Sequence, residues 1–197
     1  QDSLDNKYKD INIKGNFHNH TIFSDGIYNL KELMDIAISN NYEYLGISDH
    51  TQAMAGISDE SILEQHDKID SLNKNSTCRI LKSAECEILN NGNLDLNNDS
   101  LSKLDYTIIA IHKQINQVKR IAEQRLIKAI ENPYSNILAH PSGRLYKRKV
   151  EMCVDMYKII DACIANNVAI EINGDPNRLD LDPRYIKYAL DKGAMFT

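Results

Sequence analysis

The sequence predicts an α/β fold, a distorted parallel β/α barrel of seven strands. Short apolar runs rich in β-branched residues alternate with segments of helical periodicity, and strands that alternate with helices form parallel sheets. Five of the six histidines directly follow such runs. The carboxyl ends of parallel strands converge on one face of a barrel, whereas an open doubly wound sheet would spread them along an edge. The histidines therefore favour the barrel.

Each expected strand is a short apolar run. The first six precede helical segments, and the seventh begins at the end of the sequence, so the last elements of the barrel are expected to be cut short. No GxGxxG motif follows the first run, which argues against a dinucleotide-binding fold. The expected strands are 15–18, 43–48, 79–85, 106–111, 136–139, 167–172 and 194–197.

The expected helices carry apolar residues at spacings of three and four, which is typical of an amphipathic helix. Pro133 ends one of them, and Pro183 begins another because proline suits the first helical position. Residues 90–105 are rich in turn-forming types and are expected to be a loop. The expected helices lie at about 30–38, 58–75, 115–130 and 154–164, with one more starting near 183.

Length and composition restrict the class of protein. A chain of 197 residues suits a single domain over 1–197, with the polar residues 1–11 as a leader or linker. No apolar run is long enough to cross a membrane, and the four cysteines form no CxxC pair, so we expect a reduced, cytoplasmic protein. The net charge of −5 argues against general coating of nucleic acid but allows a local basic patch.

Histidines and acids gather at the predicted strand ends. His66 breaks the rule because it lies in the middle of a helix, so we exclude it. Imidazoles and carboxylates without thiolates suit zinc, manganese or iron. One ion needs three or four protein ligands, so seven candidates predict two or three divalent ions. The candidate ligands are His18, His20, Asp25, His50, Glu85, His112 and His140.

Closely spaced ions need a bridging carboxylate. Glu85 and Glu87 both follow the third strand, and the two-residue period of a strand points both to the same face. The pattern alone does not choose between them.

Other polar residues near the strand ends are expected to bind the substrate or orient the ligands. Arg144 closely follows His140 and can bind a phosphate group, as can Lys113 beside His112. Glu171 and Asn173 close the sixth strand and are expected to orient the metal ligands.

Six segments together resemble one known family, the polymerase-and-histidinol-phosphatase (PHP) domain. The resemblance covers about residues 12–197 and is strongest to the C-terminal PHP domain of bacterial and archaeal family X DNA polymerases. The segments are FHNHTIFSDG, GISDHT, SAECEIL, AIHK, ILAHPSGRL and EINGDPNRLDL.

The resemblance implies a trinuclear metal site. The first ion would be held by His18, His20 and Glu85, and Glu85 rather than Glu87 would bridge to the second. His112 and His140 would complete the second site, which makes Glu85, His112 and His140 the expected catalytic residues. Asp25 and His50 would hold the third ion.

Two departures from the family pattern stand out. The family ends with an Asp-x-His pair after the seventh strand, which gives one ligand each to the first and third ions. This sequence stops at GAMFT, so its second site is expected to be the most complete. Lys113 stands where the family more often has serine.

The resemblance implies a metal-dependent phosphoesterase. The expected substrate is a phosphate ester at DNA 3′ ends, processed by a 3′–5′ exonuclease or 3′-phosphatase linked to a DNA polymerase. Two alternatives are a phosphatase for a small metabolite such as histidinol phosphate, and a non-catalytic metal domain that supports a polymerase. No membrane partner is expected.

Overall fold

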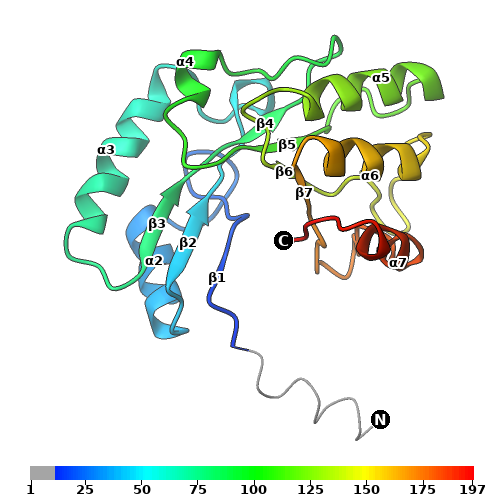
Figure 1. Cartoon of the computed structure of the whole chain (residues 1–197). Coiled ribbons are helices and arrows are strands. Elements are labelled where there is room, and N and C mark those ends of the chain that lie inside the picture. Colours follow the sequence, from blue (N-terminus) through cyan, green and yellow to red (C-terminus); the bar gives the residue numbers. More distant parts are fainter. Residues whose placement is uncertain (1–11) are drawn as a thin grey trace, which may run out of the picture.

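The computed structural model describes residues 12–197; the expected leader at 1–11 lies outside this range. The chain alternates short strands with helices, as the sequence predicts (Figure 1). The elements are β1 Gly15–Asn16, α2 Leu30–Ser39, β2 Tyr44–Ile47, η1 Gln52–Met54, α3 Ser61–Asn73, β3 Arg79–Lys82, β4 Glu85–Glu87, α4 Asn98–Leu101, β5 Ile108–Ala110, α5 Lys119–Ile130, β6 Ile137–Leu138, α6 Met156–Ala165, β7 Ala169–Ile170 and α7 Pro183–Asp191.

All strands pair in parallel, in two sheets with the orders β1-β2-β3 and β4-β5-β6-β7. The two sheets meet within one extended segment, because β3 and β4 are separated only by Ser83 and Ala84. Ser83 N still donates to Ile47 O of β2 at 2.9 Å, whereas Ala84 O accepts from Ile108 N of β5 at 3.0 Å. The strand expected at 79–85 therefore changes partners along its length.

A closed seven-stranded barrel is not confirmed. Within residues 12–197, β1 pairs only with β2, and no backbone pairing joins it to β7 or to the C-terminal segment. The strand expected at 194–197 is reduced to one bridge between Phe196 and Ile170. The loop expected at 90–105 also contains the short helix α4, because the Asn97 side chain accepts from Ser100 N at 2.9 Å and caps it.

The helices begin where side chains can cap them. Asn29 and Glu32 form a reciprocal capping box at the start of α2. Asp182 accepts from the Arg184 N–H at the start of α7, with Pro183 at the first helical position as predicted. Figure 1 shows α2 and α3 beside β2 and β3, and α5, α6 and α7 beside the second sheet.

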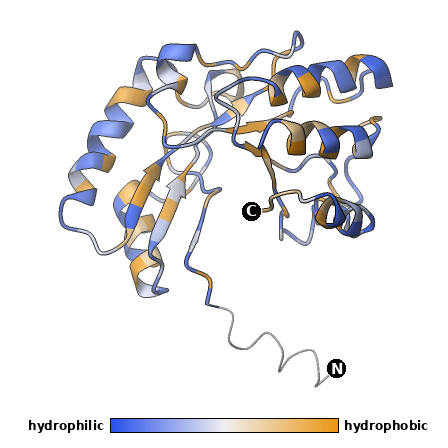
Figure 2. Ribbon diagram, in the orientation of Figure 1, coloured by the Kyte–Doolittle hydropathy of each residue, from blue (hydrophilic) through white to orange (hydrophobic). Residues whose placement is uncertain are grey.

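Alternate residues of each strand face opposite sides of the sheet. In β5, Ile109 packs into the main core with α5 and α6, whereas Ile108 and Ala110 face the interior beside Phe17 and Tyr106. Figure 2 shows apolar colouring on parts of β2 and β3 and on the strands of the second sheet, a hydrophilic β1, and mixed colouring of the helices. His112 continues the inward series of β5, so the alternation delivers it to the interior.

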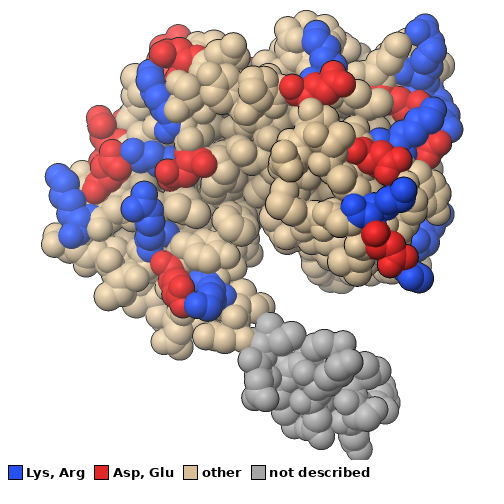
Figure 3. All heavy atoms as spheres, viewed as in Figure 1, with Lys and Arg blue, Asp and Glu red and all other residues tan. Residues whose placement is uncertain are grey.

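The visible surface carries both signs of charge. Lysines, arginines, aspartates and glutamates lie next to one another in Figure 3, and a notch separates the two halves of the molecule. No helix among the described residues is long and apolar enough to cross a lipid bilayer.

Candidate metal centre

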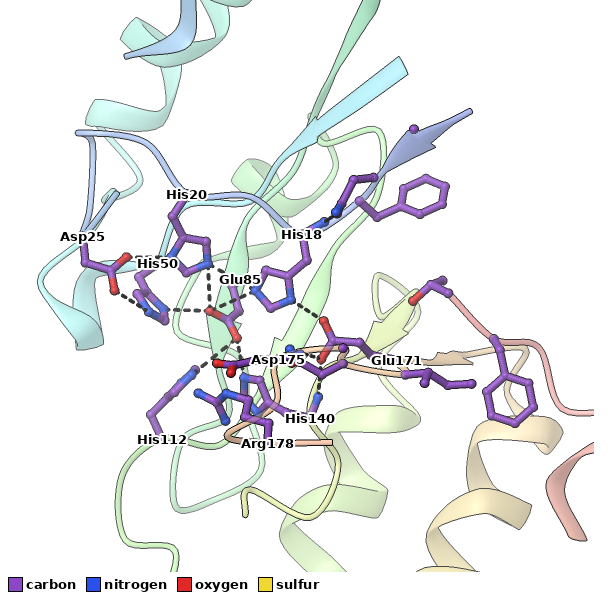
Figure 4. Close-up of a pocket in the computed structure, with 18 of the residues that line it drawn as sticks. His18, His20, Asp25, His50, Glu85, His112, His140, Glu171, Asp175 and Arg178 are labelled. Atoms are coloured by element: carbon purple, nitrogen blue, oxygen red, sulfur yellow. Dashed lines mark hydrogen bonds and ion pairs between the residues drawn. The ribbon is translucent and has the colours of Figure 1, made fainter. Parts of the chain in front are cut away.

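One buried carboxylate lies at the centre of five imidazole rings (Figure 4). Glu85 is 1% exposed. Its Oε2 lies 2.9 Å from His50 Nδ1, 3.3 Å from His20 Nε2 and 3.5 Å from His18 Nε2.

The other oxygen of Glu85 faces the remaining two rings. Oε1 lies 2.8 Å from His140 Nε2 and 3.4 Å from His112 Nε2. One carboxylate therefore contacts histidines from four separate strand ends, as the sequence predicts for a shared pocket.

Strand alternation explains most of this geometry. Ala84, Cys86 and Ile88 pack into the main core, so Glu85 and Glu87 point to the opposite face. The predicted shared face of these two acids is confirmed. His140 breaks the alternation, since Ile137 of β6 and Ala139 directly after it are the inward residues of this segment. Its φ of +30° turns the chain at the strand end, a rare conformation for a residue with a side chain.

Glu171 connects the last strand to the first. Its Oε1 lies 2.6 Å from His18 Nδ1, and its Oε2 accepts from the backbone N–H of His140 at 2.7 Å. Asn173 donates from its side chain to the same Oε2 at 3.3 Å. Glu171 therefore contacts two of the histidines that face Glu85, and Asn173 contacts Glu171.

Glu87 contacts a single imidazole ring, that of His112. Its Oε2 lies 2.8 Å from His112 Nδ1, and its carboxylate accepts from the backbone N–H groups of His112 and Lys113. Its Oε1 also lies 3.4 Å from the guanidinium of Arg125, a residue only 3% exposed. Glu87 therefore fixes the orientation of His112 and neutralises a buried arginine.

Asp25 extends the cluster towards solvent. Its Oδ1 lies 2.7 Å from His20 Nδ1 and its Oδ2 lies 3.6 Å from His50 Nε2, although its side chain is 68% exposed. The turn that carries Asp25 is held by a fully buried acid, Asp49. Asp49 accepts from Thr21 N at 2.7 Å and Ser24 Oγ at 2.6 Å.

Burial and ion pairing act in opposite directions on these groups. Burial alone would raise the pKa of Glu85, but the surrounding histidines, His112 first, hold it well below its usual range. Burial alone would lower the pKa of His18, but Glu171 and Glu85 raise it to about 10. The pKa of His112 is likewise raised to about 9 by Glu85 and Glu87. Without metal, His18 and His112 are therefore held as protonated imidazoles beside carboxylates, whereas burial lowers the pKa of His140.

The donor atoms fit divalent ions. The three sets His18–His20–Glu85, His20–Asp25–His50 and His50–Glu85–His112 each bring three ligand atoms within 4.8 Å of one another. His50 Nδ1 and His112 Nε2 are buried, face Glu85 and make no hydrogen bond within the described chain. Buried polar atoms are normally satisfied, so these nitrogens indicate missing partners. Nitrogen and oxygen donors without thiolates suit zinc, manganese or iron.

The two residues predicted to bind substrate lie elsewhere. Arg144 donates to Asp182 at 2.7 Å and to the carbonyl oxygens of Arg178 and Leu179, so its guanidinium is engaged in holding loops together. Lys113 is exposed and donates to the carbonyl oxygen of Ala53. Neither residue lines the cavity at the metal centre.

A different cationic side chain, that of Arg178, lines the wall of that cavity. The cavity has a volume of about 830 Å³, and Arg178 lines it together with Asp175 and Asn173 (Figure 4). Within residues 12–197 the Arg178 side chain makes no hydrogen bond or ion pair in the structure, unlike that of Arg144.

The sequence analysis did not identify three polar residues that the structure places at or beside the site. Asp49 precedes His50 but faces away from it, and Arg178 lies in a quoted motif that carries several other polar residues. The sequence could have indicated Arg125, because this residue falls on the apolar face of α5 between Ala122 and Leu126. A charged residue on a buried helix face indicates a buried partner.

No family model matches the chain. The DNA polymerase/3′-5′ exonuclease PolX of Bacillus subtilis is 36% identical over 185 residues, which cover 92% of this chain and 32% of that protein. The chain belongs to the PHP-domain family. A protein of Acetivibrio thermocellus named as a probable phosphatase is 29% identical to this PHP domain over 161 residues, which cover 79% of the chain and 63% of the relative.

A solved structure shows the same fold. The histidinol phosphate phosphatase of Lactococcus lactis, complexed with zinc, L-histidinol and phosphate, superposes with a TM-score of 0.58 at 15% identity. The alignment covers 93% of this PHP domain and 84% of that chain. The domain spans about a third of PolX and slightly less than two thirds of the Acetivibrio relative.

Proposed function

We propose that this chain is a metal-dependent phosphoesterase. The observation that carries the proposal is the single buried carboxylate of Glu85, surrounded by five histidines at one end of parallel strands. His18, His20, Asp25, His50, Glu85, His112 and His140 would hold two or three divalent ions of zinc, manganese or iron, with Glu85 shared between sites.

The bound ions would supply a hydroxide nucleophile at neutral pH and neutralise charge on the phosphoryl oxygens. The chain itself fixes its ligands. Glu171 holds Nδ1 of His18, and Glu87 holds Nδ1 of His112, so each ring directs Nε2 at Glu85. Such outer hydrogen bonds set the tautomer and orientation of a ligating histidine.

The substrate we propose is the 3′ end of DNA, as a 3′–5′ exonuclease or 3′-phosphatase would use. The identity to PolX over nearly the whole chain supports this choice, and it also supports a link to a DNA polymerase. A small phosphate ester such as histidinol phosphate is the second candidate. It is supported by the relatives named as probable phosphatases and by the fold shared with a histidinol phosphate phosphatase.

Turnover on matched substrates tests the proposal. The chain is loaded with Zn²⁺ or Mn²⁺ and given a 3′-phosphorylated oligonucleotide, a 3′-hydroxyl oligonucleotide and histidinol phosphate. Glu85→Gln serves as the control for contaminating phosphatase. Turnover of the oligonucleotides alone supports 3′-end processing, and turnover of histidinol phosphate alone supports the second candidate. Metal binding without turnover of any ester would refute the enzyme and favour a metal domain that supports a polymerase.

A further inference from the structure

A basic turn follows the metal ligand His140 in the chain. Residues 144–149 carry four cationic side chains in six positions. The turn closes on itself, because Leu145 N donates to Lys149 O at 3.0 Å and Lys149 N donates to Leu145 O at 2.8 Å. The turn lines a surface hollow of about 530 Å³ together with Val150, Glu151, Asp182 and Arg184.

The charge of this hollow is not balanced. It contains five cations and two carboxylates, and both carboxylates are engaged. Asp182 pairs with Arg144 at 2.7 Å, and Glu151 pairs with Arg184 at 2.8 Å.

Three neighbouring cations have no acidic partner. Within residues 12–197, no carboxylate lies within 4.0 Å of the charged groups of Lys147, Arg148 and Lys149. Most other lysines of the fold form ion pairs, as Lys31 does with Asp35 and Lys68 with Glu64. The three consecutive cations therefore leave a local positive surplus on a chain whose net charge is −5.

The turn is joined to the wall of the metal cavity. Tyr146 N donates to Asn177 O at 2.6 Å, and Arg144 Nε donates to Arg178 O at 3.1 Å. Lys149 is close enough to Arg178 that burial and the charge of Arg178 both lower the pKa of Lys149. The basic surface thus continues from the hollow to the cavity mouth.

An aromatic ring stands among these cations. Tyr146 is 64% exposed, and Lys147 Nζ lies 5.4 Å from the centre of its ring. Cations that follow a backbone and an exposed aromatic ring on which a base can stack are the two elements of single-strand recognition.

We propose that the turn 144–149, together with Arg178, is a binding surface for single-stranded nucleic acid that leads to the metal cavity. Lys147, Arg148 and Lys149 contact successive phosphates, Tyr146 stacks on a base, and Arg178 receives the phosphate nearest the ions. The proposal rests on the proposed function and specifies how a strand, as distinct from a small ester, is held.

Binding is measured without metal, so that it does not depend on turnover. A fluorescein-labelled dT12 strand is titrated with the chain in chelator, and its anisotropy is followed from 50 to 300 mM salt. Lys147→Gln/Arg148→Gln should reduce the slope of log affinity against log salt by about 1.4, since each contact to a single strand contributes about 0.7. Tyr146→Ala should lower the affinity about 5- to 150-fold.

A matched double variant controls for net charge. Lys31→Gln/Lys68→Gln removes two positive charges from α2 and α3, which lie on the other side of the molecule (Figure 1). This variant should leave the slope unchanged. An unchanged slope in Lys147→Gln/Arg148→Gln, or equal effects of both pairs, would overturn the proposal. Duplex DNA that binds as tightly as dT12, with no effect of Tyr146→Ala, would refute the single-strand assignment.

Hydrolysis of p-nitrophenyl phosphate separates this inference from the proposed function. If the metal-loaded chain hydrolyses neither this ester nor any oligonucleotide but binds dT12 through the turn, the proposed function fails and the binding surface stands. If it hydrolyses the ester and the turn variants bind dT12 normally, the binding surface fails alone. Oligonucleotide turnover should fall relative to p-nitrophenyl phosphate turnover in Lys147→Gln/Arg148→Gln.

Discussion

Replacing Glu85 and Glu87 separately with glutamine should produce opposite defects. Glu85 contacts five imidazoles within 3.5 Å and no arginine or lysine within 4.0 Å in the described chain. Glu87 contacts one imidazole, His112, and the buried guanidinium of Arg125. The two acids lie on the same face of one strand but have different neighbours.

The expected magnitudes follow from these neighbours. Glu87→Gln disturbs the orientation of one ligand, which typically costs about 10- to 100-fold in metal affinity at one ion. Glu85→Gln removes a direct ligand that would be shared between ions, so it should exceed that loss at more than one ion. For folding the order reverses. In Glu87→Gln, Arg125 cannot deprotonate, and removing the partner of a buried charge costs about 3–5 kcal/mol. In Glu85→Gln, the surrounding histidines can become neutral, so no buried charge is left without a partner.

Two measurements check this pair. Metal per chain is determined by mass spectrometry after gel filtration, and the free energy of unfolding is determined by urea denaturation in chelator. Glu85→Gln should lose nearly all metal and retain most of its free energy of unfolding. Glu87→Gln should retain most of its metal and lose more of its free energy of unfolding. Equal metal loss in both variants would show that Glu85 is not the shared ligand.

Further variants test the contacts that hold the Asp25 turn and the His50 backbone, and the charge of the cluster. Asp49→Ala should lower the free energy of unfolding by at least about 3 kcal/mol because it leaves several buried donors unsatisfied, whereas Asp49→Asn should cost about 1 kcal/mol; equal losses by urea denaturation would contradict this. Gly56→Ala would place Cβ 1.7 Å from His50 O, so we expect a loss of about 1–3 kcal/mol and of metal, and wild-type values of both would refute the contact. In chelator, the stability contributed by His18 and His112 should be complete below about pH 6.5 and be lost towards pH 9–10, because folding raises the pKa of His18 to about 10 and of His112 to about 9. Urea denaturation at pH 6, 8 and 9.5 checks this against Glu85→Gln, whose stability should depend less on pH; identical pH profiles would contradict it.

Local patterns predicted the parts of the molecule that depend on local rules. The alternation of strands and helices gave the order of elements, and the two-residue period placed Glu85 and Glu87 on one face. The position of the histidines after strands was enough to bring them together, because parallel strands end on one side.

The features that the sequence did not reveal involve partners that are distant in sequence. Arg144 was expected to bind substrate, and its pairing with Asp182, which is 38 residues away, could not be read from the sequence. Closure of the barrel depends on whether the first and last strands meet, and no pattern within β1 or β7 encodes that distance. The left-handed backbone of His140 is likewise set by the turn around it rather than by its residue type.

The side-chain contact between His18 and Glu171 spans 153 positions and joins two strands that share no backbone pairing in the described chain. Such a seam should open more readily than the paired interior of the sheets, so the amides of β1 should exchange with deuterium at a lower free energy than those of β4 and β5. Opening there would separate the imidazole of His18 from Glu85 without unfolding the main core. Ions could then enter and leave through local fluctuations, and their exchange rate would be set by this one contact rather than by the stability of the whole fold.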